Sequence, residues 1–180
     1  MLQVIVPQRE FFDETKQEFV FVKEETFQLE HSLVSLAKWE AKWCKPFLGK
    51  DEKTTEETLD YIRCMTITQN VSLEVYNYLP PEVQSQIMDY INAPMTATWF
   101  SDDKGPKGNR EIITAEVIYY WMIAQTIPME CQKWHLNRLL TLIKVCSIKS
   151  APPKKRGRKE MMNSRTALNE ARRNAMNSKG

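Results

Sequence analysis

Histidine, glycine and closely spaced cysteine are scarce in this chain. Its 180 residues include two histidines, five glycines and four cysteines. Histidine is the commonest general base and, with cysteine, the commonest zinc ligand, so few catalytic or metal-binding arrangements can be built. The phosphate-binding patterns GxxxxGK and GxGxxG and the nucleophile pattern GxSxG are also absent. We therefore expect a protein that is not an enzyme and has no cofactor.

The cysteines give no metal-binding pattern. They are Cys44, Cys64, Cys131 and Cys146, and no two of them form a CxxC pair. Cys131 and His135 are four residues apart and would share one face of a helix, but a zinc site needs two further ligands, and His31 is the other histidine. We therefore predict no metal site, a packed or hydrogen-bonded His135, and free, mostly buried thiols in a reducing compartment.

Long apolar runs are absent as well. The longest one, Val117 to Ala124, is far too short to cross a bilayer. The apolar run from Met1 to Pro7 has no basic leader and is too short for the core of a signal peptide. We expect a cytoplasmic protein that makes no membrane contact.

Charge is present in both signs but is distributed unevenly. The net charge is only +2, yet residues 151–180 contain nine Lys or Arg and two Glu, a net charge of +7, which leaves −5 for the first 150 residues. Such a chain can bind an acidic partner, nucleic acid or an acidic face of a second copy. The basic residues singled out for such contacts are Lys154, Lys155, Arg156, Arg158, Arg172 and Arg173.

One short segment of the basic tail points toward DNA. Arg156, Gly157 and Arg158, flanked by lysines, resemble the core of minor-groove AT-hook segments, although Lys159 stands where a proline normally follows. A solvated basic linker is the simpler interpretation of such a charge run. No aromatic residue lies within 151–180, which argues against stacking on single-stranded bases. Nucleic acid is therefore a less favoured partner than protein.

The N-terminal residues have the composition of a small antiparallel sheet. Leu2 to Val6, Glu18 to Val22 and Thr26 to Glu30 are rich in β-branched and aromatic residues. The polar residues around Gln8 to Lys16 separate the first run from the second. We predict three strands, with residues 8–16 as a linker.

Helix signals follow. Ser32 is a suitable N-cap for a helix to about Cys44, and Thr54 and Thr55 before two glutamates indicate the start of another. Pro80 and Pro81 predict a helix through Ile91. The remaining intervals are Leu73 to Tyr78, a short strand or helical turn, and Ser101 to Asn109, a surface loop.

The longest helical stretch runs from Glu111 to Lys149. Apolar residues fill all faces of its first helix, including Ile113, Val117, Tyr120, Trp121 and Ala124 on one face and Ile112, Ile118, Tyr119, Met122 and Ile123 on the others. A helix that is apolar all round is normally enclosed, so we expect it to be central. Pro128 fits the first turn of a second helix, which predicts an antiparallel helical hairpin.

After Ser147 the composition changes, because Pro152 and Pro153 interrupt the helix and a basic run follows. Glu160 to Asn177 has helix-forming residues but few apolar ones, so this segment should be ordered mainly by a partner. The predicted fold is therefore mainly α. It has a helical domain over residues 1–150, with a small β element in residues 1–31, and a basic helical arm over residues 151–180.

Several stretches in chain order resemble a protein family of long-tailed bacteriophages, the tail assembly chaperones and minor tail-morphogenesis proteins. They are LEHSL (29–33), SLAKWEAKWCKPFL (35–48), EIITAEVIYYWM (111–122), KWHLNRLLTLIKVCSIK (133–149), PPKK (152–155) and LNEARRNAMNSKG (168–180). The resemblance covers more than half of the chain. Residues 1–25 and 66–110 carry little of it.

The resemblance implies a chaperone in the host cytoplasm that covers the apolar stripes of a long helical tape-measure protein until the tail tube forms around it. Two alternatives stay open. One is a structural protein of the neck or tail, and the other is a DNA-binding packaging accessory, which the net charge of +7 over residues 151–180 and the Arg156–Arg158 core suggest. Self-association is a further expectation, because the basic arm complements the acidic body. The aromatic residues expected to contact a protein partner, or to form the core, are Trp39, Trp43, Trp121 and Trp134.

Overall fold

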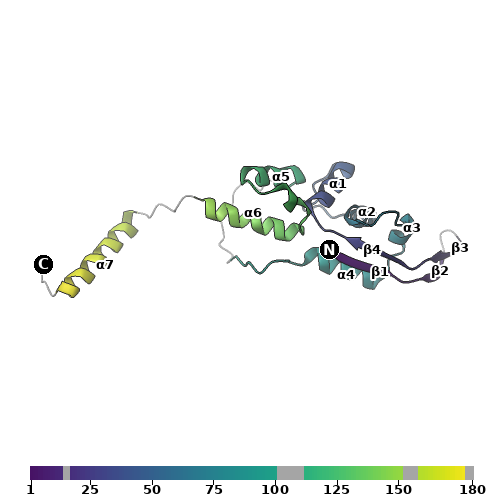
Figure 1. Ribbon diagram of the computed structural model, residues 1–180, viewed down its shortest axis with the longest axis horizontal. Coiled ribbons are helices and arrows are strands. Elements are labelled where there is room, and N and C mark those ends of the chain that lie inside the picture. Colours follow the sequence, from purple (N-terminus) through teal and green to yellow (C-terminus); the bar gives the residue numbers. More distant parts are fainter. Residues whose placement is uncertain (14–16, 101–111, 152–157, 177–180) are drawn as a thin grey trace. The chain divides into compact units, whose positions relative to one another are not determined.

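The computed structural model describes residues 1–13, 17–100, 112–151 and 158–176 (Figure 1). Contacts between residues divide the chain into two compact units, Met1–Ile148 and Lys149–Gly180. Within the described ranges there are seven α-helices, one 3-10 helix and four short strands. The prediction of a mainly α protein with a small antiparallel β part is confirmed.

The strands form one interrupted hairpin, visible in Figure 1 as β1 and β4 continuing into β2 and β3. Their bounds are β1 Leu2–Val6, β2 Arg9–Asp13, β3 Glu18–Val22 and β4 Glu25–Leu29. The antiparallel register pairs Leu2 with Leu29 and Arg9 with Val22, so no residue is gained or lost between the two ladders. Pro7 lies at the interruption, where its missing N–H cannot serve a ladder. The predicted linker over 8–16 is therefore wrong, since β2 lies within it.

The buried face of the hairpin changes at this interruption. In the first ladder Val4, Val6 and Phe27 are fully buried, as alternation along a half-buried strand requires. In the second ladder Val22 is buried, whereas Phe19 and Phe21 are exposed. Val22 precedes Glu25 by three positions, an odd number, so the buried residues of the two ladders lie on opposite faces of the ribbon. Aromatic side chains of β3 therefore face outward.

Helices α1 (Leu33–Trp43) and α2 (Thr55–Met65) begin where their capping residues indicate. The Ser32 hydroxyl accepts the Ser35 N–H, and α1 ends at Cys44 in the left-handed region with φ 52°. Thr54 and Glu57 form a reciprocal capping box at the start of α2. Both predicted helix starts are confirmed.

Two further helices complete the first core cluster. α3 (Leu73–Asn77) settles the interval predicted as strand or helical turn in favour of helix, and α4 (Pro81–Asn92) has its proline in the first turn. Apolar side chains from β1, β3, β4 and α1 to α4 fill this cluster; its largest fully buried members are Trp39, Phe27, Leu29, Met65, Ile87 and Val4.

A second core cluster joins α1 to the helices that follow residue 112. α5 (Ala115–Ala124), the 3-10 helix η1 (Met129–Lys133) and α6 (Leu136–Ser150) contribute to it. Its members with 1% exposure or less are Leu33, Leu36, Ala115, Ile118, Met122, Leu136 and Leu139. Pro128 therefore precedes a 3-10 turn, and the long helix begins eight residues later. The predicted α-helix from Pro128 is wrong, because Trp134 is extended and interrupts it.

Helix α5 is not enclosed as predicted. One face, with Ala115, Ile118 and Met122, packs in the second cluster. On the opposite side Tyr120 and Ile123 are each 67% exposed. α5 therefore has more apolar side chains than this fold buries, and it lies at an edge of the second cluster.

The second unit contains α7 (Arg158–Met176), close to the segment Glu160 to Asn177 that was predicted to be helix-forming. Side chains from Met162 to Met176 are exposed. The predicted loop over Ser101–Asn109 and the basic residues Lys154, Lys155 and Arg156 lie outside the described residues. Among the described helices, none has the length and apolar character needed to cross a membrane.

Candidate functional site

The densest polar cluster joins α1 to α2 around Asp60. Lys42 Nζ lies 2.5 Å from one carboxylate oxygen, Trp43 Nε1 donates to the other at 2.9 Å, and Arg63 Nη1 lies 3.5 Å away. The Asp60 side chain is only 7% exposed. Burial by itself raises the pKa of Asp60, but the hydrogen bonds from Lys42 and Trp43 outweigh it, so that its pKa lies below the usual value.

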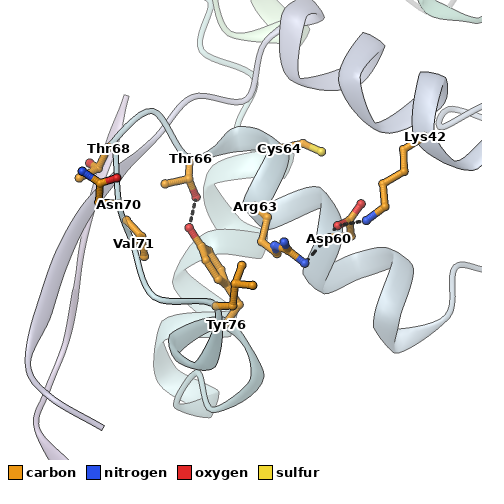
Figure 2. A pocket seen from close by; sticks show the side chains of 10 residues that line it. Lys42, Asp60, Arg63, Cys64, Thr66, Thr68, Asn70, Val71 and Tyr76 are labelled. Atoms are coloured by element: carbon orange, nitrogen blue, oxygen red, sulfur yellow. Dashed lines mark hydrogen bonds and ion pairs between the residues drawn. The ribbon is translucent and has the colours of Figure 1, made fainter.

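A pocket of about 400 Å³ opens beside this cluster (Figure 2). It lies between α1, α2, the segment after α2 and α3, and several of its polar groups take part in hydrogen bonds or ion pairs. Tyr76 donates its hydroxyl proton to Thr66, and Thr66 donates to the Ile62 carbonyl, each at 2.9 Å. Burial raises the pKa of the Cys64 thiol, which keeps it protonated. The pocket therefore presents an ion-pair network rather than an activated nucleophile.

A second ion pair extends the α1–α2 contact. Lys45 Nζ lies 2.5 Å from Glu57, and the Thr54 N–H donates to the same carboxylate at 2.9 Å. The hydrogen bond from Lys45 is the main cause of the lowered pKa of Glu57, followed by the Thr54 amide. Trp39 Nε1 donates to the Glu57 carbonyl at 2.8 Å. These bonds fix the packing of α1 on α2.

Glu40 links α1 to the start of α5. This buried carboxylate accepts the Phe47 N–H and the Ala115 N–H, both at 2.7 Å. The second bond satisfies one of the free amides of the first turn of α5, because Thr114, the N-cap residue, makes no side-chain capping bond. A residue 75 positions away thus caps α5.

Both histidines of the chain meet where the two core clusters join. The rings of His31 and His135 lie 4.9 Å apart in an edge-to-face arrangement. His31 Nδ1 lies 2.6 Å from the Tyr61 hydroxyl, and His135 Nε2 lies 2.9 Å from the Tyr90 carbonyl, which makes Nε2 the protonated nitrogen. His135 Nδ1 is buried without a hydrogen-bond partner. We call this group the histidine seam.

Electrostatics keep the histidine seam neutral. Burial, followed by the charge of His135, lowers the pKa of His31 from 6.5 to about 4. Burial also lowers the pKa of His135, against the opposing effect of its bond to Tyr90, and the Met1 amino group lowers it further. Burial raises the pKa values of Tyr61 and Tyr90. The rings of His31, His135, Tyr61 and Tyr90 are therefore all uncharged at neutral pH.

The histidine seam does not provide a set of metal ligands. Cys131 lies in η1 and His135 lies between η1 and α6, so the two do not occupy successive turns of one helix as the spacing suggested. Within the described ranges, no group of three or more His, Cys, Asp or Glu side chains is arranged to hold a metal ion.

The four tryptophans expected at a partner surface lie at different depths. Trp39 is 1% exposed and belongs to the first core cluster. Trp43, Trp121 and Trp134 are half-buried. The Arg138 guanidinium lies 4.2 Å from the centre of the Trp134 ring. The last three tryptophans thus each retain some accessible surface, whereas Trp39 contacts a partner only if the core opens.

The basic residues singled out in the tail are only partly placed. Arg172 and Arg173 lie on α7 with exposed side chains, and Arg158 is its first residue. The other three lie outside the described residues.

Two apolar surfaces stand out within the described residues. The outer α5 face consists of Glu116, Tyr120 and Ile123, which follow one another at spacings of four and three. The hairpin face consists of Glu10, Phe12, Phe19 and Phe21, which alternate along β2 and β3. Sequence reasoning missed the hairpin face. Its signal was the run EFVFV, in which phenylalanine and valine alternate, so that both faces of the strand are apolar.

Comparison with known proteins gives no further assignment. No family model, no curated protein and no solved structure matches this chain.

Proposed function

We propose that this protein is a tail assembly chaperone of a long-tailed bacteriophage that binds the tape-measure protein in the host cytoplasm. The proposal starts from the resemblance carried by residues 29–48, 111–122 and 133–149. The single observation that supports it best is the outer α5 face, because Tyr120 and Ile123 are each 67% exposed on an otherwise apolar helix. An apolar partner helix would complete the enclosure that the composition of α5 favours.

Binding would follow the helix-in-groove pattern. A tape-measure helix presents apolar residues at spacings of three and four, which match the spacing of Tyr120 and Ile123 on α5. Trp121 is half-buried and adjacent, so it can extend the contact without leaving its core position. Glu116, at the edge of this face, is placed to select a helix with a basic residue beside its apolar stripe.

Coexpression with the tape-measure protein of the same phage tests the proposal. The chain should keep that protein soluble and copurify with it, whereas Tyr120→Ser combined with Ile123→Ser should reduce copurification roughly tenfold or more. A matched control is Leu73→Ser combined with Met88→Ser, since these side chains are 59% and 45% exposed on α3 and α4. Equal retention by both double variants would reject the outer α5 face as the binding surface.

A census of purified particles separates the chaperone from a structural component. A chaperone leaves before the virion is complete, so mass spectrometry should find the chain in assembly intermediates and not at ring-like copy number in mature particles. Stoichiometric presence in the virion would favour the neck or tail protein instead.

DNA binding is a second candidate, favoured by the net +7 charge of residues 151–180 and by the exposed Arg172 and Arg173. Contacts to several phosphates would make the affinity fall steeply as salt increases. A duplex gel-shift titration at two salt concentrations tests this. Tight, salt-dependent binding would favour the packaging accessory, and absence of binding at low salt would remove it.

A further inference from the structure

The hairpin face is an apolar surface with a defined shape. Phe12, Phe19 and Phe21 are 45%, 74% and 51% exposed. The rings of Phe12 and Phe19 lie 5.2 Å apart, edge to face, so they form one contiguous surface rather than scattered side chains. Exposed aromatic surface of this kind typically marks a protein contact.

One acidic residue belongs to this surface. The register places Glu10 opposite Phe21 on the hairpin face, and Glu10 is exposed. Glu18 precedes Phe19 and therefore lies on the other face of the ribbon. A partner that covers the rings and carries a basic residue beside its contact surface would pair with Glu10.

Helix α7 has the complementary chemistry. Residues at spacings of three and four form an uncharged stripe of Ser164, Leu168, Ala171 and Ala175. Arg165 and Arg172 follow one border of this stripe at a spacing of seven. Leu168 is 53% exposed, and the other side chains from Met162 to Met176 are exposed too. The small alanines allow close approach of aromatic rings on a partner.

The two surfaces also agree in length. Five residues of a strand span about 16 Å, and the rise from Ser164 to Ala175 along a helix is about 17 Å. One stripe of α7 is therefore long enough to cover one face of β2 and β3 from end to end, with an arginine of its border beside Glu10.

We propose that the hairpin face of one copy binds α7 of a second copy. Phe19 and Phe21 pack against the stripe around Leu168, and Arg172 lies against Glu10. Reciprocal exchange gives two equal contacts related by a twofold axis, a closed dimer. This contact does not rest on the proposed function, because tape-measure binding is assigned to the outer α5 face.

Light scattering of the full chain over a wide concentration range tests the contact. The wild-type protein should form a dimer whose dissociation constant rises with salt, as a contact with paired charges requires. Arg172→Glu should raise the dissociation constant roughly tenfold or more. Arg173→Glu is the matched control, because it makes the same charge change at the next position, away from the stripe, and should have little effect.

Two further variants keep the test decisive. Phe19→Thr combined with Phe21→Thr should abolish the dimer, and circular dichroism should show an intact fold because both side chains are exposed. Glu10→Arg should restore dimerisation to Arg172→Glu, since the charges are exchanged. A wild-type monomer at every concentration, equal effects of the two arginine variants, or failure of the charge exchange would overturn the proposal.

Discussion

The contact between α1 and α2 and the position of α5 depend on different forces. Buried carboxylates of Glu57 and Asp60 bind Lys45 and Lys42, each at 2.5 Å, so directional bonds fix α1 against α2. α5 carries one charged residue, Glu116, and packs mainly through apolar side chains. Hydrogen bonds and ion pairs have a direction and therefore specify one arrangement of two helices. Apolar surface favours burial but does not specify which apolar neighbour covers it. An apolar partner can therefore cover the exposed face of α5, whereas the contact between α1 and α2 is already fixed by bonds within the pair.

The largest expected effect on stability follows from removing the carboxylate of Glu40, which bonds to the start of α5. Glu40→Ala leaves the buried amides of Phe47 and Ala115 without an acceptor. The expected loss is about 4 kcal/mol of unfolding free energy, from two charge-assisted bonds. Denaturant titration measures it, and faster hydrogen exchange at the Ala115 amide locates it. Glu40→Gln keeps one acceptor oxygen and should cost roughly half as much; an equal cost for both variants would contradict the assignment of two separate bonds.

The histidine seam makes stability depend on pH. The pKa of His31 is about 4 when folded, compared with an ordinary value of 6.5. Between these pH values the unfolded chain therefore binds more protons than the folded chain. The contribution of neutral, buried His31 to the unfolding free energy is complete above pH 6.5 and is lost as the pH falls toward 4. The loss is about 3 kcal/mol for a shift of this size, from 6.5 to about 4.

Unfolding titrations in urea at several pH values between 4 and 7 check this dependence. His31→Gln keeps an acceptor for the Tyr61 hydroxyl but does not titrate, so its stability should change much less over that range. An unchanged slope in this variant would show that other groups cause the acid sensitivity.

The two helix starts provide a matched pair of smaller effects. Thr54 closes a capping box on α2, so Thr54→Ala should cost about 1 kcal/mol. Thr114 stands at the same position before α5 but makes no capping bond, so Thr114→Ala should stay within about 0.5 kcal/mol. Thermal or denaturant unfolding of the two variants measures the difference. Equal costs would mean that Glu40 does not replace the cap of α5.

The smallest effect on stability is expected at the outer α5 face. Tyr120→Ser combined with Ile123→Ser removes two exposed apolar side chains, and the unfolding free energy should change by less than about 1 kcal/mol. Denaturant unfolding of the isolated protein checks this. A large destabilisation would mean that this face is covered within the molecule itself.

Local signals predicted most helix boundaries, because their causes are local. Ser32, Thr54 and Pro81 each act on the first turn of the helix that follows, so the residues beside them suffice. β2 was missed because Arg9, Glu10 and Asp13 give it the composition of a loop. Pairing with the apolar β3 stabilises it as a strand, and pairing depends on residues outside the segment.

The parts of the candidate site that depend on distant contacts were not predictable. Nothing near Glu40 indicates that it caps a helix starting 75 residues later. The His31–His135 contact likewise joins two residues whose own neighbours suggest only local packing. For α5, periodicity showed which faces are apolar but not how many of them the fold covers.

The backbone bond from the Leu136 N–H to the His31 carbonyl, at 2.8 Å beside the histidine seam, has a consequence for folding kinetics. It closes a loop of about 100 residues, and contacts of such sequence separation form late because the entropy of loop closure must be overcome first. During synthesis, the ribbon and α1 to α4 can collapse while Leu33 and Leu36 still lack their partners from α5 and α6. The nascent chain therefore passes through a stage with an uncovered half-core, and docking of α6 is the step that ends its susceptibility to aggregation.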